Sequence, residues 1–225
     1  IDLFAWWFPT TLNDEAKLIL DVLRRHNIKA QLWVTGGGGP VSNEEEQRQR
    51  VVAEAERIRA IALAAQEIGC EVALYNHGGW FGEPENQIAI IEHMKLPNVG
   101  IVYNLHHGHA HLTRFPELLA KMKPHLMALN LNGMVIGGDA NGNKIMPLGT
   151  GTLDRALLKA IVDSGYQGPI GILNHTDHDA EARLLDNLDG LEWLLKSNDQ
   201  DAPFPTYRTW NGPRPVDEDL VSWSE

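Results

Sequence analysis

Short apolar runs alternate with amphipathic stretches along the chain. In the stretch at residues 13–26, apolar side chains recur at helical spacing, Asn13 is a candidate N-cap, and basic residues end the segment. The apolar runs predict six β-strands, at residues 1–8, 28–35, 71–76, 99–104, 126–131 and 169–174. The amphipathic stretches predict helices at residues 13–26, 43–68, 85–94, 114–122, 153–164 and 179–195.

Strict alternation of strands and helices indicates a parallel sheet covered by helices. An open doubly wound sheet usually carries a glycine-rich phosphate fingerprint, and the glycines at residues 36–39 lack both that spacing and the Lys-Ser/Thr of a P-loop. We therefore expect an α/β fold of the TIM (β/α)8 barrel type at residues 1–196, with two further strands upstream of Ile1. Residues 197–225 form an irregular tail in which Trp210 and Trp223 are available for docking.

Composition narrows the class of protein. The 225 residues are 43% hydrophobic and carry a formal charge of −11, which argues against binding to a nucleic-acid backbone. No apolar run approaches the roughly 20 residues of a membrane helix, so we expect a soluble protein, cytoplasmic or exported. The single cysteine, Cys70, excludes an internal disulfide and is expected to be a buried thiol. A homo-oligomeric state is left open.

Polar residues gather where the predicted strands end, which is where barrel enzymes carry their functional groups. Seven of the ten histidines follow strand ends. They are His77, His106, His107, His109, His111, His175 and His178. Asparagines accompany them and, with His106, are expected to bind substrate. These are Asn76, Asn104, Asn130, Asn132 and Asn174.

Imidazole is the commonest protein ligand for Zn, Fe, Ni or Mn, so His77, His107 and His175 are predicted to hold one divalent ion. The predicted acid and base groups are His109, His178 and Asp177, while Lys144 would supply positive charge to an enolate or a phosphate. Trp33 and Trp80 follow strands and are candidates for stacking on a sugar ring. The alternative is that these side chains only bond one another and water in a polar barrel mouth.

Five segments carry a family resemblance: VALYNHGGW, NVGIVYNLHHGH, Leu126–Met134, PLGTG and GYQGPIGILNH. They resemble the xylose isomerase-like TIM barrel superfamily of sugar isomerases and epimerases. The resemblance implies a (β/α)8 barrel with a divalent metal held by Glu, Asp, His and Glu. At the corresponding positions this chain has Tyr75 or Asn76, Asn104, Asn130, and Leu173 or Asn174, so every charged ligand is replaced.

Three classes of function follow from these observations. The leading hypothesis is a metal-dependent sugar isomerase or epimerase that moves a proton beside a sugar carbonyl, and a lyase or hydratase on 3-keto sugars or glycosides is its alternative. A non-catalytic carbohydrate-binding barrel would explain the missing carboxylates. An endonuclease of the apurinic-site type is disfavoured because a basic groove and acidic ligands are both missing.

Overall fold

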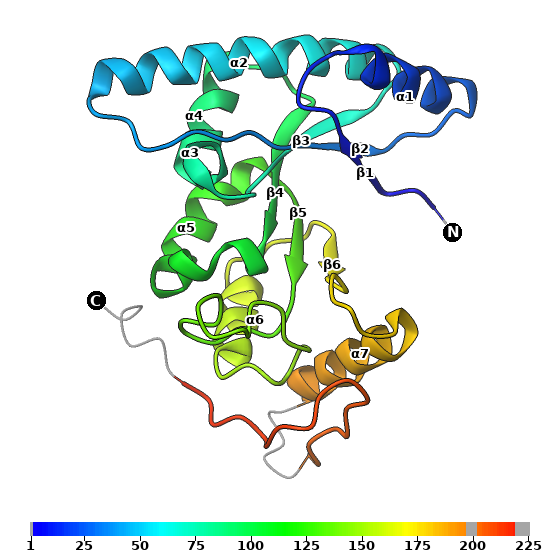
Figure 1. The fold of residues 1–225 in the computed structure, drawn as a ribbon, viewed down its shortest axis with the longest axis vertical. Coiled ribbons are helices and arrows are strands. Elements are labelled where there is room, and N and C mark those ends of the chain that lie inside the picture. Colours follow the sequence, from blue (N-terminus) through cyan, green and yellow to red (C-terminus); the bar gives the residue numbers. More distant parts are fainter. Residues whose placement is uncertain (1, 197–201, 219–225) are drawn as a thin grey trace. The chain divides into compact units, whose positions relative to one another are not determined.

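The computed structural model describes residues 2–196 and 202–218. Its strands run in chain order across the sheet, β1-β2-β3-β4-β5-β6 (Figure 1). Pairing is parallel between β1 and β2, β2 and β3, β3 and β4, and β5 and β6. The strands are β1 (Ala5–Phe8), β2 (Gln31–Val34), β3 (Glu71–Tyr75), β4 (Val99–Asn104), β5 (Leu126–Leu131) and β6 (Ile170–Ile172). All six predicted strands are thus confirmed.

The six predicted helices are also present, with ends that differ by at most one residue from those expected. They are α1 (Asp14–Arg25), α2 (Glu44–Glu67), α4 (Pro84–Met94), α5 (Phe115–Met122), α6 (Asp154–Asp163) and α7 (Ala180–Lys196). The sequence did not predict the short helix α3 (Gly79–Gly82) or the 3-10 turns. These turns are η1 (Leu105–His107), η2 (His109–Arg114) and η3 (Lys123–His125).

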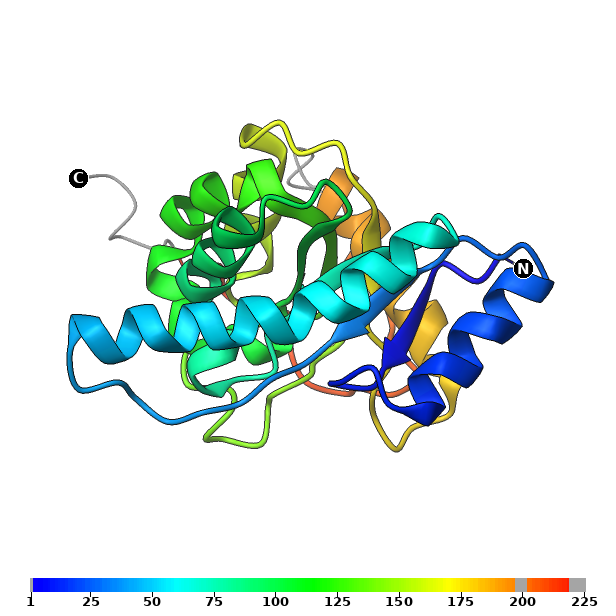
Figure 2. The same cartoon turned by 90° about the horizontal axis from the view of Figure 1, so that it is seen from above.

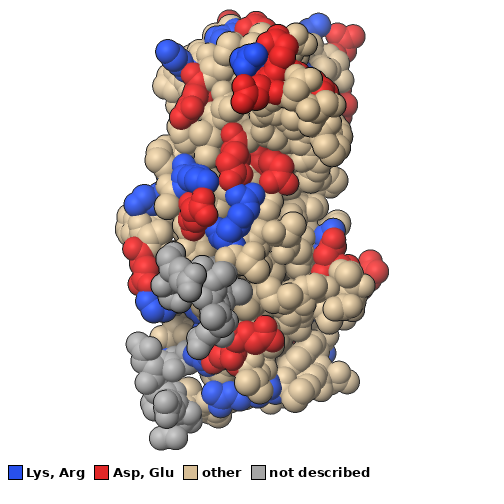
Figure 3. Space-filling view, turned by 90° about the vertical axis from the view of Figure 1, so that its left-hand side faces the viewer, with Lys and Arg blue, Asp and Glu red and all other residues tan. Residues whose placement is uncertain are grey.

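The chain divides into two compact units. The first unit contains Ile1–Tyr103 and Lys121–Met127, and the second contains Asn104–Ala120 and Ala128–Glu225. No helix in the described part of the chain is both long and apolar enough to cross a membrane. On the face drawn in Figure 3, acidic and basic residues are interspersed among the described residues, without a continuous basic stripe.

In the first unit, α2 begins with a side-chain cap at Asn43 and packs on the sheet. The Asn43 side chain accepts a hydrogen bond from the Glu46 amide at 2.9 Å, which satisfies one free donor of the first turn. The helix contacts β3 and α4, and α1 lies beside it (Figure 2). Cys70 is buried at the start of β3, as predicted.

In the second unit, a long loop joins β5 to α6 and is organised by the buried carboxylate of Asp154. This carboxylate accepts hydrogen bonds from the amides of Met134, Gly149 and Gly151, at 2.7, 2.7 and 3.0 Å. Desolvation raises the pKa of Asp154 to about 7, although the amide donors act in the opposite direction. One side chain therefore closes the loop that follows β5.

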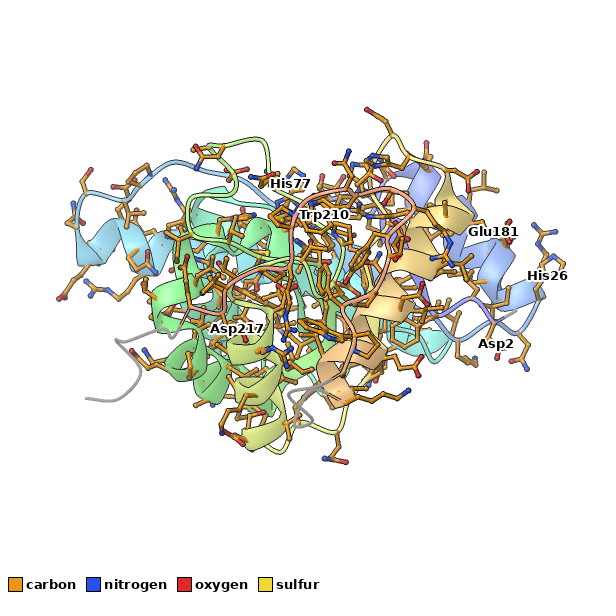
Figure 4. All side chains as sticks on the ribbon, turned by 90° about the horizontal axis from the view of Figure 1, so that it is seen from below. Asp2, His26, His77, Glu181, Trp210 and Asp217 are labelled. Atoms are coloured by element: carbon orange, nitrogen blue, oxygen red, sulfur yellow. The ribbon has the colours of Figure 1, made fainter. Side chains whose placement is uncertain are left out.

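The described part of the tail packs on α7. The ring of Phe204 contacts Trp193 of α7 edge-on, with centroids 5.1 Å apart, and Tyr207 and Trp210 extend this cluster. Trp210, labelled in Figure 4, therefore packs within the second unit. Trp223 lies outside the described residues.

Candidate active site at the strand ends

In the first unit, an aromatic patch forms at the carboxyl ends of β1, β2 and β3. Trp7 pairs in register with Trp33, and Trp33 pairs with Ala73, two residues before Tyr75, so the three aromatic rings share one face of the sheet. Trp7 meets Tyr75 edge-on at 4.6 Å between centroids, and His77 lies 6.2 Å from Tyr75. Burial raises the pKa of Tyr75 to about 12, so its phenol stays protonated at neutral pH.

The two tryptophans predicted to stack on sugar are placed differently. Trp33 is half-buried and donates its indole N–H to Gln31 at 3.1 Å. Trp80 lies in the short helix α3, and its side chain is buried. Its indole donates to Gln47 at 2.6 Å and Arg50 lies over its ring, so the role of Trp80 in sugar binding stays a prediction.

Trp7 was not predicted as a site residue. It is 52% exposed, although it lies in a strand and packs on Tyr75. The signal that could have found it is the two-residue period of a strand, because this period places Trp7 and not Trp6 on the face that carries Trp33. Asn76 at the same strand end is buried, whereas His77 is exposed (labelled in Figure 4).

In the second unit, two predicted asparagines meet directly. The amide of Asn130, in β5, donates to the side-chain oxygen of Asn104, at the end of β4, at 2.6 Å. Gly171 of β6 permits this arrangement, since a Cβ at that position would overlap the Asn130 side chain. Both asparagines are buried, so this side-chain hydrogen bond joins the ends of β4 and β5 in the protein interior.

His106 and His107 follow in the turn η1, with ring centroids 3.7 Å apart. His106 is 5% exposed, and its Nδ1 atom has no hydrogen-bond partner among the described residues. Burial lowers the pKa of His106 to about 3, and the nearby His107, Lys144 and His175 act in the same direction. The His106 ring is therefore neutral at physiological pH.

The backbone of Lys144 links the β5 loop to the histidines. Its carbonyl lies 3.0 Å from His109 Nε2 and accepts a 3.3 Å hydrogen bond from the side-chain amide of Asn132. The Lys144 ammonium pairs with Asp139 at 3.0 Å and lowers the pKa of that carboxyl. Asp139 is a partner that the sequence did not predict, and the positive charge expected of Lys144 is thus half of an ion pair.

The loop after β6 carries the remaining candidates. His175, Asp177 and His178 are exposed, and the His178 ring lies 3.3 Å from the Thr176 hydroxyl. Asn174 accepts a hydrogen bond from Asn187 of α7 at 2.8 Å. The second unit therefore holds His106, His107, His109 and His175 close enough to influence one another electrostatically.

A metal ion is expected at the strand ends. The side chains there are of a suitable chemical kind, but the described residues do not group enough of them around one point. Neutral imidazoles suit a borderline divalent ion, and His106 offers an unpartnered ring nitrogen. Within residues 2–196 and 202–218, however, no three His, Cys, Asp or Glu side chains are grouped closely enough to hold an ion. The ligands His77, His107 and His175 are divided between the two units and stay a prediction.

Comparison with known proteins gives a family and a fold. A family model described as a xylose isomerase-like TIM barrel matches residues 11–197. No curated protein sequence matches the chain. Solved structures of similar fold include three with relevant names, and at identities below 20% this likeness concerns the fold alone.

The first is a 3-keto-D-glucoside 4-epimerase from E. coli, with 18% identity and a TM-score of 0.57, covering 85% of this chain and 76% of that one. The second is the IolI protein with a bound zinc atom, with 16% identity and a TM-score of 0.67, covering 88% and 77%. The third is the probable 3-DHS dehydratase AsbF from Bacillus anthracis, with 14% identity and a TM-score of 0.63, covering 87% and 76%.

Proposed function

The chain belongs to the xylose isomerase-like TIM barrel family, and from this premise we propose that it is an enzyme that moves a proton at a carbon beside the carbonyl of a small carbohydrate. The observation that carries the proposal is the histidine cluster of the second unit. There His106, His107 and His109 follow β4, and His175 follows β6. A barrel site with several imidazoles offers both the base and the acid that such a reaction needs.

In the proposed reaction, a neutral imidazole or the Asp177 carboxylate removes the proton from the carbon beside the carbonyl. Negative charge then develops on the carbonyl oxygen, where N–H donors such as the Asn132 amide or the Lys144 ammonium would stabilise it. Return of the proton to the opposite face of the same carbon is epimerisation. Its return to the former carbonyl carbon, while a proton passes from the neighbouring hydroxyl to the former carbonyl oxygen, is isomerisation. His109, His178 and Asp177 are the proposed acid and base groups.

The aromatic patch of the first unit supports a carbohydrate as the substrate. The C–H faces of a sugar ring are apolar, and they pack on exposed aromatic rings such as Trp7 and the half-buried Trp33. The buried amides Asn76, Asn104 and Asn130 would accept and donate hydrogen bonds to sugar hydroxyls. Two of the similar solved structures are named for epimerases acting on carbohydrates, which agrees with this choice.

A lyase or dehydratase on a keto sugar or glycoside is the second candidate. It begins with the same proton removal but ends with loss of a leaving group at the next carbon. The observation that favours it is chemical: the strand ends that carry Glu and Asp in the resembling sugar isomerases carry Asn here, so a pair of carboxylates to shuttle protons is replaced by imidazoles. A dehydratase is also among the similar structures.

Metal dependence is a separate part of the proposal. The candidate ligands are His77, His107 and His175, and a divalent Mn, Zn, Fe or Ni ion at them would stabilise negative charge on the substrate oxygen. The solved IolI structure is described with zinc, which supports testing zinc first.

The experiment that tests the proposed function is proton exchange in D2O. Ketoses and 3-keto-glycosides are incubated with the protein, and mass spectrometry with NMR reads deuterium at the carbon beside the carbonyl. We expect exchange that falls at least about 100-fold in a His107→Ala, His175→Ala double variant. His93→Ala, an exposed histidine on α4, is the matched control.

The products separate the candidates. Deuterated epimer or isomer supports the leading proposal, whereas an unsaturated or cleaved product supports the lyase. Binding of sugar without exchange, in a protein loaded with each candidate metal, would overturn both and leave a carbohydrate-binding barrel.

A further inference from the structure

The tail segment beyond the family-matched region is tied to the loop that carries part of the candidate site. The family match ends at residue 197, and the described tail begins again at residue 202. Both the tail and the loop between β5 and α6 belong to the second unit. We propose that residues 207–209 form a positioning strap, which fixes this loop so that the Lys144 carbonyl can orient His109 and Asn132.

The strap is anchored on a buried carboxylate of α7. Asp186 is fully buried and accepts hydrogen bonds from the backbone amides of Arg208 and Thr209, at 2.7 and 2.6 Å. The Thr209 hydroxyl donates to the same carboxylate at 2.7 Å. These donors hold the pKa of Asp186 below its ordinary value, although burial opposes them. A buried charge with this many donors defines one conformation of the tail.

Arg183 carries the connection from the strap to the loop. Its side chain is 2% exposed, so its guanidinium is taken out of water. One nitrogen donates to the Thr209 hydroxyl at 3.1 Å, and another donates to the Ile145 carbonyl at 2.8 Å. Thr209 therefore accepts from Arg183 while it donates to Asp186, and the guanidinium is aimed at the residue that follows Lys144.

A second connection holds the same loop three residues further along. The Tyr207 hydroxyl donates to the Leu148 carbonyl at 2.8 Å, and the Leu148 amide donates to Asn187 of α7 at 2.9 Å. Asn187 also donates to Asn174 at the end of β6. The loop is thus clamped at Ile145 and Leu148, and one clamp continues to a predicted substrate-binding residue.

The site end of this path is the Lys144 carbonyl, which faces His109 Nε2 and the Asn132 amide. A carbonyl can only accept, so it selects the tautomer of His109 with the proton on Nε2 and leaves Nδ1 as the basic nitrogen. The inference rests on the proposed function in assigning His109 a role, but the positioning itself can be measured without substrate.

Thr209→Val and Tyr207→Phe test the strap, because each removes one hydroxyl and keeps the shape of the side chain. Thr206→Val is the matched control, since Thr206 is exposed and outside this network. In Thr209→Val and in Tyr207→Phe, but not in Thr206→Val, we expect the amides of Met146, Leu148 and Gly149 to exchange with D2O about tenfold faster. We also expect 15N NMR to show that His109 populates both tautomers.

A purely structural tail would lower the melting temperature without changing His109. The proposal is therefore overturned if both variants keep the wild-type His109 tautomer and loop exchange rates, or if Thr206→Val changes them equally. Neither readout uses catalysis, so failure of the strap and failure of the proposed enzyme activity are distinguishable.

Discussion

His106 shows how burial sets the chemistry of a single residue. Its folded-state pKa of about 3 lies below the ordinary value of 6.5, so between these values the unfolded chain binds a proton that the folded chain does not. His106 therefore stabilises the fold less as the pH falls from 6.5 toward 3. Asp154 has the opposite sign, because its pKa is raised from 3.8 to about 7 and folding takes up a proton in that window.

The first prediction follows from these opposing signs. Between pH 6 and pH 4, the pH-dependent contributions of His106 and Asp154 to the free energy of unfolding offset each other in the wild type. A His106→Asn variant retains only the contribution of Asp154. The free energy of unfolding of the variant, relative to wild type, should rise by about 2 to 3 kcal/mol from pH 6 to pH 4. Urea denaturation at several pH values measures this difference, and parallel profiles for the two proteins would contradict the buried neutral ring.

At the scale of elements, α7 approaches the β5 loop through a glycine. A Cβ at Gly190 would overlap the carbonyl oxygen of Leu148, so the helix surface must be flat at this point. In an exposed helix, replacing glycine with alanine stabilises by up to about 1 kcal/mol. The close contact reverses that sign here.

We therefore predict that Gly190→Ala destabilises the protein by about 2 kcal/mol, because overpacking outweighs helix propensity. Leu188→Ala changes an exposed position of the same helix and should cost about 0.5 kcal/mol or less. Chemical denaturation measures both. An equal or higher stability of Gly190→Ala would show that α7 and the loop separate easily.

The elements themselves were largely predictable from sequence, and the site was predictable only in part. Long apolar periods and caps such as Asn13 fix α1 and its neighbours locally, so the helix ends differ from expectation by at most one residue. The helix α3 was missed because a segment of four residues is too short to show a helical period of hydrophobic positions. The pairing of Trp80 with Gln47, and of Lys144 with Asp139, joins residues whose proximity only the folded chain creates.

At the scale of the whole molecule, the chain belongs to the xylose isomerase-like TIM barrel family, and the predicted metal ligands are spread over both of its units. His107 and His175 belong to the second unit and His77 to the first. Metal binding at all three would therefore require both units in one folded protein. Metal binding is therefore the predicted property that depends most directly on the folding of the complete chain.

Zinc loading tests the predicted ligand set of His77, His107 and His175. After incubation with zinc and desalting, this ligand set requires the purified protein to retain close to one ion per chain, since three imidazoles around one ion hold zinc tightly. The His77→Ala, His107→Ala double variant should lose it, whereas the exposed His26→Ala variant (His26 is labelled in Figure 4) should not. Elemental mass spectrometry measures the content. Zinc retained by the double variant, or absent from all three proteins after loading with Mn, Fe and Ni as well, would contradict this ligand set.

The buried carboxylate of Asp186 also determines where this chain can be truncated or joined to another barrel in a chimera. A fragment that ends where the family match ends, at residue 197, keeps every predicted site residue but loses the donors from Arg208 and Thr209. Such a fragment would carry a desolvated negative charge without its partners, an arrangement that typically costs several kcal/mol. Chimeric barrels built from this chain should therefore be joined beyond residue 210, because the segment that must stay together for stability is longer than the segment that matches the family.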